Sequence, residues 1–159
     1  MGLFQTEDTW AGLILRVALG AVMLPHGAQK LLGWFGGPGF HGTIQIFSEK
    51  LQIHPFFTLL VILSEFFGSI GLIIGFLTKI NAFGTLCVMT GAILLVHWPN
   101  GFFMNWHGNQ AGEGFEFHLL AIGISLALMV TGGGKWSVDE GITTALGYRS
   151  RRTTRLIRL

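Results

Sequence analysis

Residues 10–34 read WAGLILRVALGAVMLPHGAQKLLGW, and this stretch decides the fold. A helix of these 25 residues would be about 37 Å long, and the hydrocarbon core of a bilayer is about 30 Å thick. The stretch is therefore long enough to cross a membrane. It also carries Arg16, His26 and Lys30. Charged side chains in a spanning helix face protein or water rather than lipid, so we expect the rest of the chain to cover this polar face.

The composition indicates a membrane protein with one domain. The chain has 159 residues, of which 50% are apolar and 11% are charged, whereas about 25% of the residues are charged in soluble domains. Cys87 is the only cysteine, so no disulfide can form within the chain. Dithiol oxidoreductase chemistry needs two thiols, and this class of enzyme is excluded for the chain by itself.

Three further apolar stretches cover residues 55–77, 80–98 and 115–130. Between the first and second spans, residues 43–53 place Ile44, Phe47 and Leu51 on one helical face. This pattern is typical of a short helix that lies in the membrane interface. We therefore predict an all-α protein: a four-transmembrane-helix bundle with a short interfacial helix between spans one and two.

Local signals predict finer features of these helices. Pro25 removes a backbone donor and predicts a kink in span one. Gly71 and Gly75 form a GxxxG pair, which is typical of close helix packing. Ser137 and Glu140 fit a capping box, which predicts a short helix, up to residue 147, after the last span.

Lysine and arginine residues in the short loops predict the orientation of the chain. Six lie in the tail from Lys135 onward and one, Lys79, lies in the turn between spans two and three, whereas the other side has only Lys50. Both termini are therefore predicted to be cytoplasmic. We divide the chain into a four-helix membrane domain, residues 1–147, and a basic cytoplasmic tail, residues 148–159.

The arginines of this tail predict attraction to anionic lipid, worth about 1 kcal/mol for each residue near a membrane surface. A nucleic-acid partner is disfavoured, because no folded basic domain accompanies the tail. The expected partner of the chain is thus the lipid bilayer.

Ionisable side chains from all four spans fall in the outer half of the bilayer. At 1.5 Å per residue, Lys30 lies about 6 Å from the outer end of its span, His26 about 12 Å and Glu65 about 15 Å. The other members stand at the outer ends of spans three and four. The candidate cofactor-binding set is His26, Lys30, Glu65, His97, Trp98, Glu116 and His118. We predict no metal site.

A carboxylate within a span needs an opposite charge, and either Lys30 or Arg16 can supply it to Glu65. We predict a structural ion pair between Arg16 and Glu65 that fixes the register of two helices. Simpler roles stay open for the other members. Lys30 could extend to the interface, and His97 could be an interfacial residue with no further role.

Several motifs stand in a fixed order along the chain. Residues 15–20 read LRVALG, 26–31 HGAQKL, 33–39 GWFGGPG and 97–103 HWPNGFF; Glu65 with Gly68, residues 116–118 (EFH) and residues 137–139 (SVD) complete the series. Together these motifs resemble the DoxX family of small bacterial integral membrane proteins, and the resemblance covers about residues 9 to 142.

The resemblance implies a four-helix, multi-pass protein of the bacterial cytoplasmic (inner) membrane with a redox association. One relative is the membrane subunit of an archaeal thiosulfate:quinone oxidoreductase, and mycobacterial relatives are linked to oxidative-stress complexes. Soluble or membrane-bound redox partner proteins are therefore expected, and a homo-oligomer stays open.

Two functions from different classes remain. In the first, the chain is the membrane subunit of a quinone-linked or oxidative-stress redox complex. Lys30, His26 and His97 would donate to quinone carbonyls, and Glu65 and Glu116 would relay protons. A partner would supply the electrons, since the sequence has no flavin, iron–sulfur or dithiol motif. In the second, the chain is a non-catalytic scaffold or assembly factor for partner enzymes. Whether the chain is itself an enzyme stays open.

Haem is disfavoured as a cofactor. His26, His97 and His118 lie on three spans and could ligate its iron, but membrane histidines have many other uses. Quinone is the expected cofactor.

Overall fold

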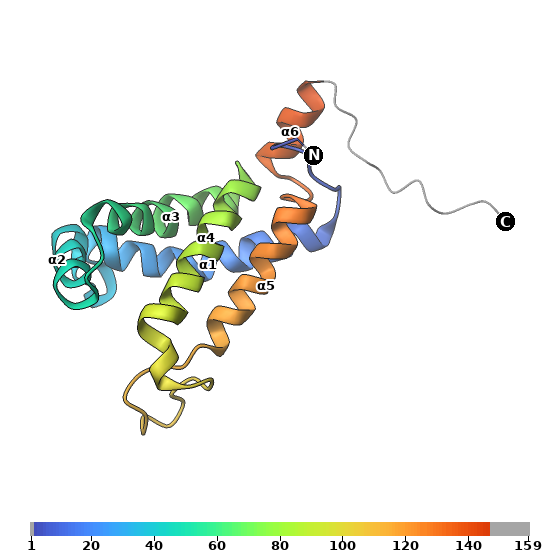
Figure 1. The fold of residues 1–159 in the computed structure, drawn as a ribbon. Helices are drawn as coiled ribbons and strands as arrows, with labels where there is room; N and C mark the ends of the chain where they lie inside the picture. Colours follow the sequence, from blue (N-terminus) through green and yellow to red (C-terminus); the bar gives the residue numbers. More distant parts are fainter. Residues whose placement is uncertain (1, 147–159) are drawn as a thin grey trace.

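The computed structural model describes residues 2–146 (Figure 1). This part of the chain is all-helical, with no strand. Its α-helices are α1 (Trp10–Leu32), α2 (Gly39–Leu51), α3 (Pro55–Ile74), α4 (Thr78–Ala92), α5 (Glu116–Thr131) and α6 (Val138–Ala145). Three short elements complete the order: the 3-10 turns η1 (Trp34–Gly36) and η3 (Trp98–Asn100), and the π-helical η2 (Ile93–His97), which continues α4.

Three helical segments of the described chain are long and apolar enough to cross a membrane: Trp10–Leu32, Pro55–Ile74 and Thr78–Asn100. The fourth predicted span is the apolar α5, which has only 16 residues. At 1.5 Å per residue it is about 24 Å long, shorter than a hydrocarbon core of about 30 Å. The all-α class is thus confirmed, with three helices of sufficient length and apolarity to span a membrane and a shorter fourth apolar helix beside them.

Helices α1 and α3 pack against each other in antiparallel directions. Gly20 of α1 lies against Ser69 and Ile73, and Gly27 lies against the backbone of Glu65 and Phe66. Residue numbers rise on one helix as they fall on the other, which is the sign of the antiparallel arrangement. Small residues at such a contact let two helix backbones approach closely.

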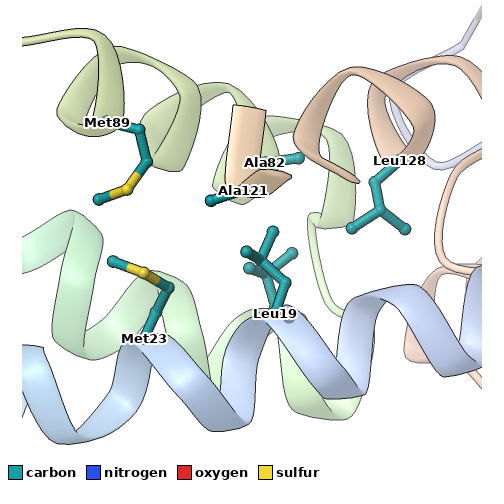
Figure 2. Close-up of a cluster of buried hydrophobic side chains, with 7 residues drawn as sticks. Leu19, Met23, Ala82, Met89, Ala121 and Leu128 are labelled. Atoms are coloured by element: carbon teal, nitrogen blue, oxygen red, sulfur yellow. The ribbon is translucent and has the colours of Figure 1, made fainter. Parts of the chain in front are cut away.

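The second helix pair, α4 and α5, closes the core. Buried apolar side chains from four helices meet there: Leu19 and Met23 of α1, Leu72 of α3, Ala82 and Met89 of α4, and Ala121 and Leu128 of α5. Figure 2 shows Met23 and Met89 facing each other from opposite sides of this core. The core therefore joins the two pairs near the middle of α1.

The end of the bundle where the described chain begins and ends is fixed by Arg16. Its guanidinium donates to the carbonyls of Gly133, at 2.8 Å, and of Leu72, at 3.2 Å. It also donates to three further backbone carbonyls, those of Ile73, Lys135 and Trp136. Arg16 thereby ties α1 to the C-terminal end of α3 and to the segment before α6.

Asp139 of α6 adds a second fastening at the same end. Its two carboxylate oxygens accept from the backbone N–H groups of Leu77 and Thr78, both at 2.8 Å. These are donors at the start of α4, which have no partner within the helix. Away from this end the two pairs diverge: α2 lies beside the far end of α1 and α3, and the loop after η3 lies at the far end of α4 and α5 (Figure 1).

The local predictions have mixed outcomes. The Ser137 half of the capping box is confirmed, because the Ser137 hydroxyl accepts from Glu140 N at 3.1 Å. The Glu140 carboxylate reaches one residue further back and accepts from Trp136 N at 2.8 Å, and α6 ends at Ala145.

Gly71 and Gly75 do permit close packing, but not as one face of a helix: Gly71 lies against the Asn81 side chain of α4, whereas Gly75 ends α3 with φ +74° as a left-handed C-cap and lies against Ser137. The close approach of the α1 and α3 backbones is made by Gly20 and Gly27.

Two other predictions concern α1 and α2. Helix α1 continues through Pro25 as one helix to Leu32. The helix predicted over residues 43–53 exists as α2 and begins earlier, at Gly39. Its Thr43 is buried and donates to the carbonyl of Lys30 at 3.1 Å, which fixes α2 against α1. The predicted tail, residues 148–159, lies outside the described residues.

Replacing Gly27 by alanine tests the contact between α1 and α3. The added methyl group would stand 2.5 Å from Phe66 N and 2.6 Å from Glu65 O. These are backbone atoms that cannot turn aside, and overpacking of this kind costs about 1–3 kcal/mol. We expect a lower thermal unfolding temperature in mild detergent. Gly123→Ala in α5 is the matched control, because nothing lies within 4 Å of its added Cβ. An equal loss in both variants would contradict the packing described.

Candidate functional site

A cavity of about 630 Å³ lies between the diverging helix pairs. Helix α1 contributes Met23, His26 and Lys30, and α3 contributes Val61 and Glu65. The opposite wall comes from α4, η2, α5 and the loop before α5, and α2 lines a further side with Phe47 and Lys50. Most of the lining is apolar. The cavity is open to the surroundings, because lining residues such as Lys50 and Leu95 are exposed.

An ion pair between α1 and α3 forms one of two polar regions in the lining of this cavity, each called a pole below. Lys30 Nζ lies 2.5 Å from Glu65 Oε2, with the two side chains 21% and 5% exposed. Lys30 therefore does not simply extend to the interface, since its charge is held by a buried carboxylate. An ammonium has three donors, so two remain beyond the one used by Glu65.

The predicted ion pair between Arg16 and Glu65 is wrong. Glu65 is paired with Lys30, and Arg16 is bonded to backbone carbonyls at the other end of the bundle. The physical reason is register. In the antiparallel packing, Arg16 stands beside Leu72 and Ile73 of α3, about two turns beyond Glu65.

Three histidines face the cavity from two sides. His97 of η2 and His118 of α5 are in ring contact, with centroids 4.1 Å apart. His26 of α1 also lines the cavity, and its ring lies 6.4 Å from that of Phe117. His118 is only 6% exposed, and its Nδ1 has no hydrogen-bond partner. The second polar pole of the cavity is thus an imidazole pair opposite the ion pair.

Two members of the predicted set are not brought to the cavity. Trp98 is 63% exposed and stacks on Phe115, with centroids 5.5 Å apart. The Glu116 carboxylate accepts from Met104 N at 2.9 Å and from Trp106 Nε1 at 3.3 Å. Both side chains are turned toward the loop between η3 and α5, which they hold in place.

Sequence reasoning missed other lining residues: Phe47 and Lys50 of α2, Cys87 of α4, and Glu113 in the loop. The apolar stripe of α2 is a usable signal. The interfacial prediction turns this stripe toward lipid, but Phe47 and Leu51 line the cavity. Glu113 gives no signal, since it stands in a loop without periodicity.

The lining is amphiphilic as a whole. Apolar side chains form most of it, and the polar groups gather at two poles on facing helices. Such a site fits a ligand with an apolar body and a few hydrogen-bonding atoms.

The chain matches a known family of proteins. The family model described as DoxX matches residues 11–98. The matched part extends from α1 to the start of η3 and contains Lys30, Glu65 and His97, whereas His118 lies beyond it. No curated protein and no solved structure matches the chain.

A double-mutant cycle tests the observed pairing. We expect Lys30→Met and Glu65→Gln to be coupled in the free energy of unfolding by about 0.5–3 kcal/mol, the range for groups in contact. Arg16→Met and Glu65→Gln should be additive within about 0.5 kcal/mol, the range for independent sites. Unfolding would be followed by titration with a denaturing detergent in mixed micelles. If Arg16→Met and Glu65→Gln were coupled while Lys30→Met and Glu65→Gln were additive, Glu65 would be paired with Arg16, as the sequence predicted, and the pairing described here would be contradicted.

Proposed function

The chain belongs to the DoxX family of membrane proteins, and we propose that it is a quinone-binding membrane subunit of a redox complex. The observation that carries this proposal is the cavity between the two helix pairs, with its Lys30–Glu65 pole and its imidazole pole. A quinone combines an apolar ring and tail with two polar oxygens on opposite sides of the ring. Its shape and polarity match a site of this kind.

The polar lining has groups suited to the head of a quinone. Lys30 retains two donors for a carbonyl oxygen, and His118 has an unpartnered nitrogen. Met23, Val61 and Phe47 would surround the apolar part of the ligand. A lipid-soluble molecule could enter where the helix pairs diverge, without passing through water.

The proposed placement in the membrane follows from the charges and from the helix ends. The lysines and arginines of the loops favour cytoplasmic termini in a bacterial inner membrane. Helix α5 would make the fourth crossing beside α4, with which it packs. The cavity would then open in the outer half of the bilayer, away from Arg16.

A partner protein completes the proposed reaction. Reducing a quinone to its hydroquinone takes two electrons and two protons, and the chain has no flavin, iron–sulfur or dithiol motif to supply the electrons. A soluble or membrane-bound redox protein would deliver them. The cavity would hold the quinone and give it access to protons.

A second candidate function is a non-catalytic scaffold or assembly factor. The Lys30–Glu65 pair also favours this function, because it joins α1 to α3 and would stabilise the bundle without any ligand. The two functions differ in whether the cavity holds a small molecule.

The test is to extract the protein, purified in mild detergent, with organic solvent and to measure quinone by mass spectrometry. We expect about one quinone per chain, in excess of a matched membrane-protein control. The double variant Lys30→Met/Glu65→Gln removes both charges together and should lose most of this quinone. Lys79→Met, at the turn before α4 and outside the cavity lining, should keep it. No enrichment in the unaltered protein would favour the scaffold.

A further inference from the structure

The hydrogen bond of His97 determines which of its nitrogens carries the proton. Nδ1 lies 2.8 Å from the backbone carbonyl oxygen of Glu113. A carbonyl oxygen only accepts, so Nδ1 must carry a hydrogen and donate it. A neutral imidazole has one N–H. Nε2 of the neutral His97 ring therefore carries a lone pair and no hydrogen. It can accept a hydrogen bond but cannot donate one.

Two neighbouring parts of the chain hold the His97 ring in this position: the loop that contains Glu113 and the helical segment η2. Asn100 Nδ2 donates to the same Glu113 oxygen at 3.0 Å, and the Glu113 carboxylate accepts from Asn105 N at 2.7 Å. On the other side, His97 ends the π-helical η2, whose Leu95 and Val96 also line the cavity. Short π-helical segments are frequent at functional sites. The backbone thus presents His97 to the cavity while the loop fixes its tautomer.

The charged and titratable groups around His97 leave its Nε2 free for a ligand. His118 of α5 is in contact with its ring, and Glu113 of the loop is engaged as described. The groups that face it across the cavity are His26 and Lys30 of α1, Lys50 of α2 and Glu65 of α3. Lys30 is held by Glu65. Among the described residues, no donor is bonded to Nε2.

We propose that His97 makes the cavity selective for the reduced, hydroxyl-bearing form of its aromatic ligand, a hydroquinone rather than a quinone. A hydroquinone O–H donates to the Nε2 lone pair, whereas a quinone carbonyl would direct its own lone pairs at the same nitrogen. The ammonium of Lys30 does not discriminate, since the oxygens of both forms accept. This inference rests on the proposed function and adds the oxidation state that the site prefers.

The test compares the affinity of the two forms for the full chain in lipid nanodiscs. The probes are a benzoquinone with a decyl side chain and its hydroquinone, added without oxygen at pH 8 and followed by equilibrium dialysis. One neutral hydrogen bond gained by one form and lost by the other corresponds to about a tenfold difference in affinity. We expect the hydroquinone to bind more tightly by this factor.

Variants connect the preference to His97. In His97→Phe the ring is retained and the acceptor is lost, so the ratio of the two affinities should fall to about one. His107→Phe is the matched control, because His107 is an exposed histidine of the neighbouring loop outside the cavity lining. It should keep the unaltered ratio. Equal affinities in the unaltered protein, or an unchanged ratio in His97→Phe, would overturn the inference and leave the proposed function standing. Binding of neither form would overturn the proposed function itself.

A second measurement reads the tautomer of His97 directly in the unaltered protein and needs a variant only for assignment. In protein labelled with ¹⁵N-histidine, the neutral His97 ring should show a protonated Nδ1 and an unprotonated Nε2. The resonance is assigned by its absence from His97→Phe or, where that variant fails to fold, from His97→Gln. The opposite tautomer would overturn the inference, because Nε2 would then be a donor suited to a carbonyl.

Discussion

The charge of Arg16 is the constraint on which the rest of this structure depends. A guanidinium cannot be left among lipid tails, and within a membrane its donors must find protein acceptors. The last carbonyls of a helix have no partner within it, and Arg16 uses those of Leu72 and Ile73 at the end of α3 together with those of Gly133 and its neighbours. The helix ends that supply these carbonyls must therefore meet around Arg16. At the opposite end of the bundle no buried arginine among the described residues draws the two helix pairs together, and the space between the pairs there is the cavity.

Much of the fold can be predicted from the sequence, because hydropathy and helix rise are one-dimensional properties. The starts of α1 at Trp10 and of α3 at Pro55 are visible in the pattern of apolar residues. Depth along a helix axis is equally one-dimensional, and by depth alone His26, Lys30, Glu65, His97 and His118 belong to the same half of the bilayer. These residues do line one cavity.

Direction around a helix and register between helices cannot be predicted in this way. Charge alone pairs Arg16 with Glu65, but the acceptors of Arg16 are backbone carbonyls, which no pattern of side chains reveals. Trp98 and Glu116 stand at the right depth and are turned to the loop. The cavity exists because the two helix pairs diverge. The angle between the pairs depends on how all the helices pack together, so it cannot be predicted from the sequence of any one helix.

The position of Cys87 has a practical consequence. It is the only thiol of the chain, and it is an exposed residue of α4 that lines the cavity. A spin label or an environment-sensitive fluorophore can therefore be attached beside the cavity without any substitution in the protein. Such a reporter turns the width and polarity of the space between the helix pairs into spectroscopic quantities, which can be followed in a bilayer as the lipid composition is varied.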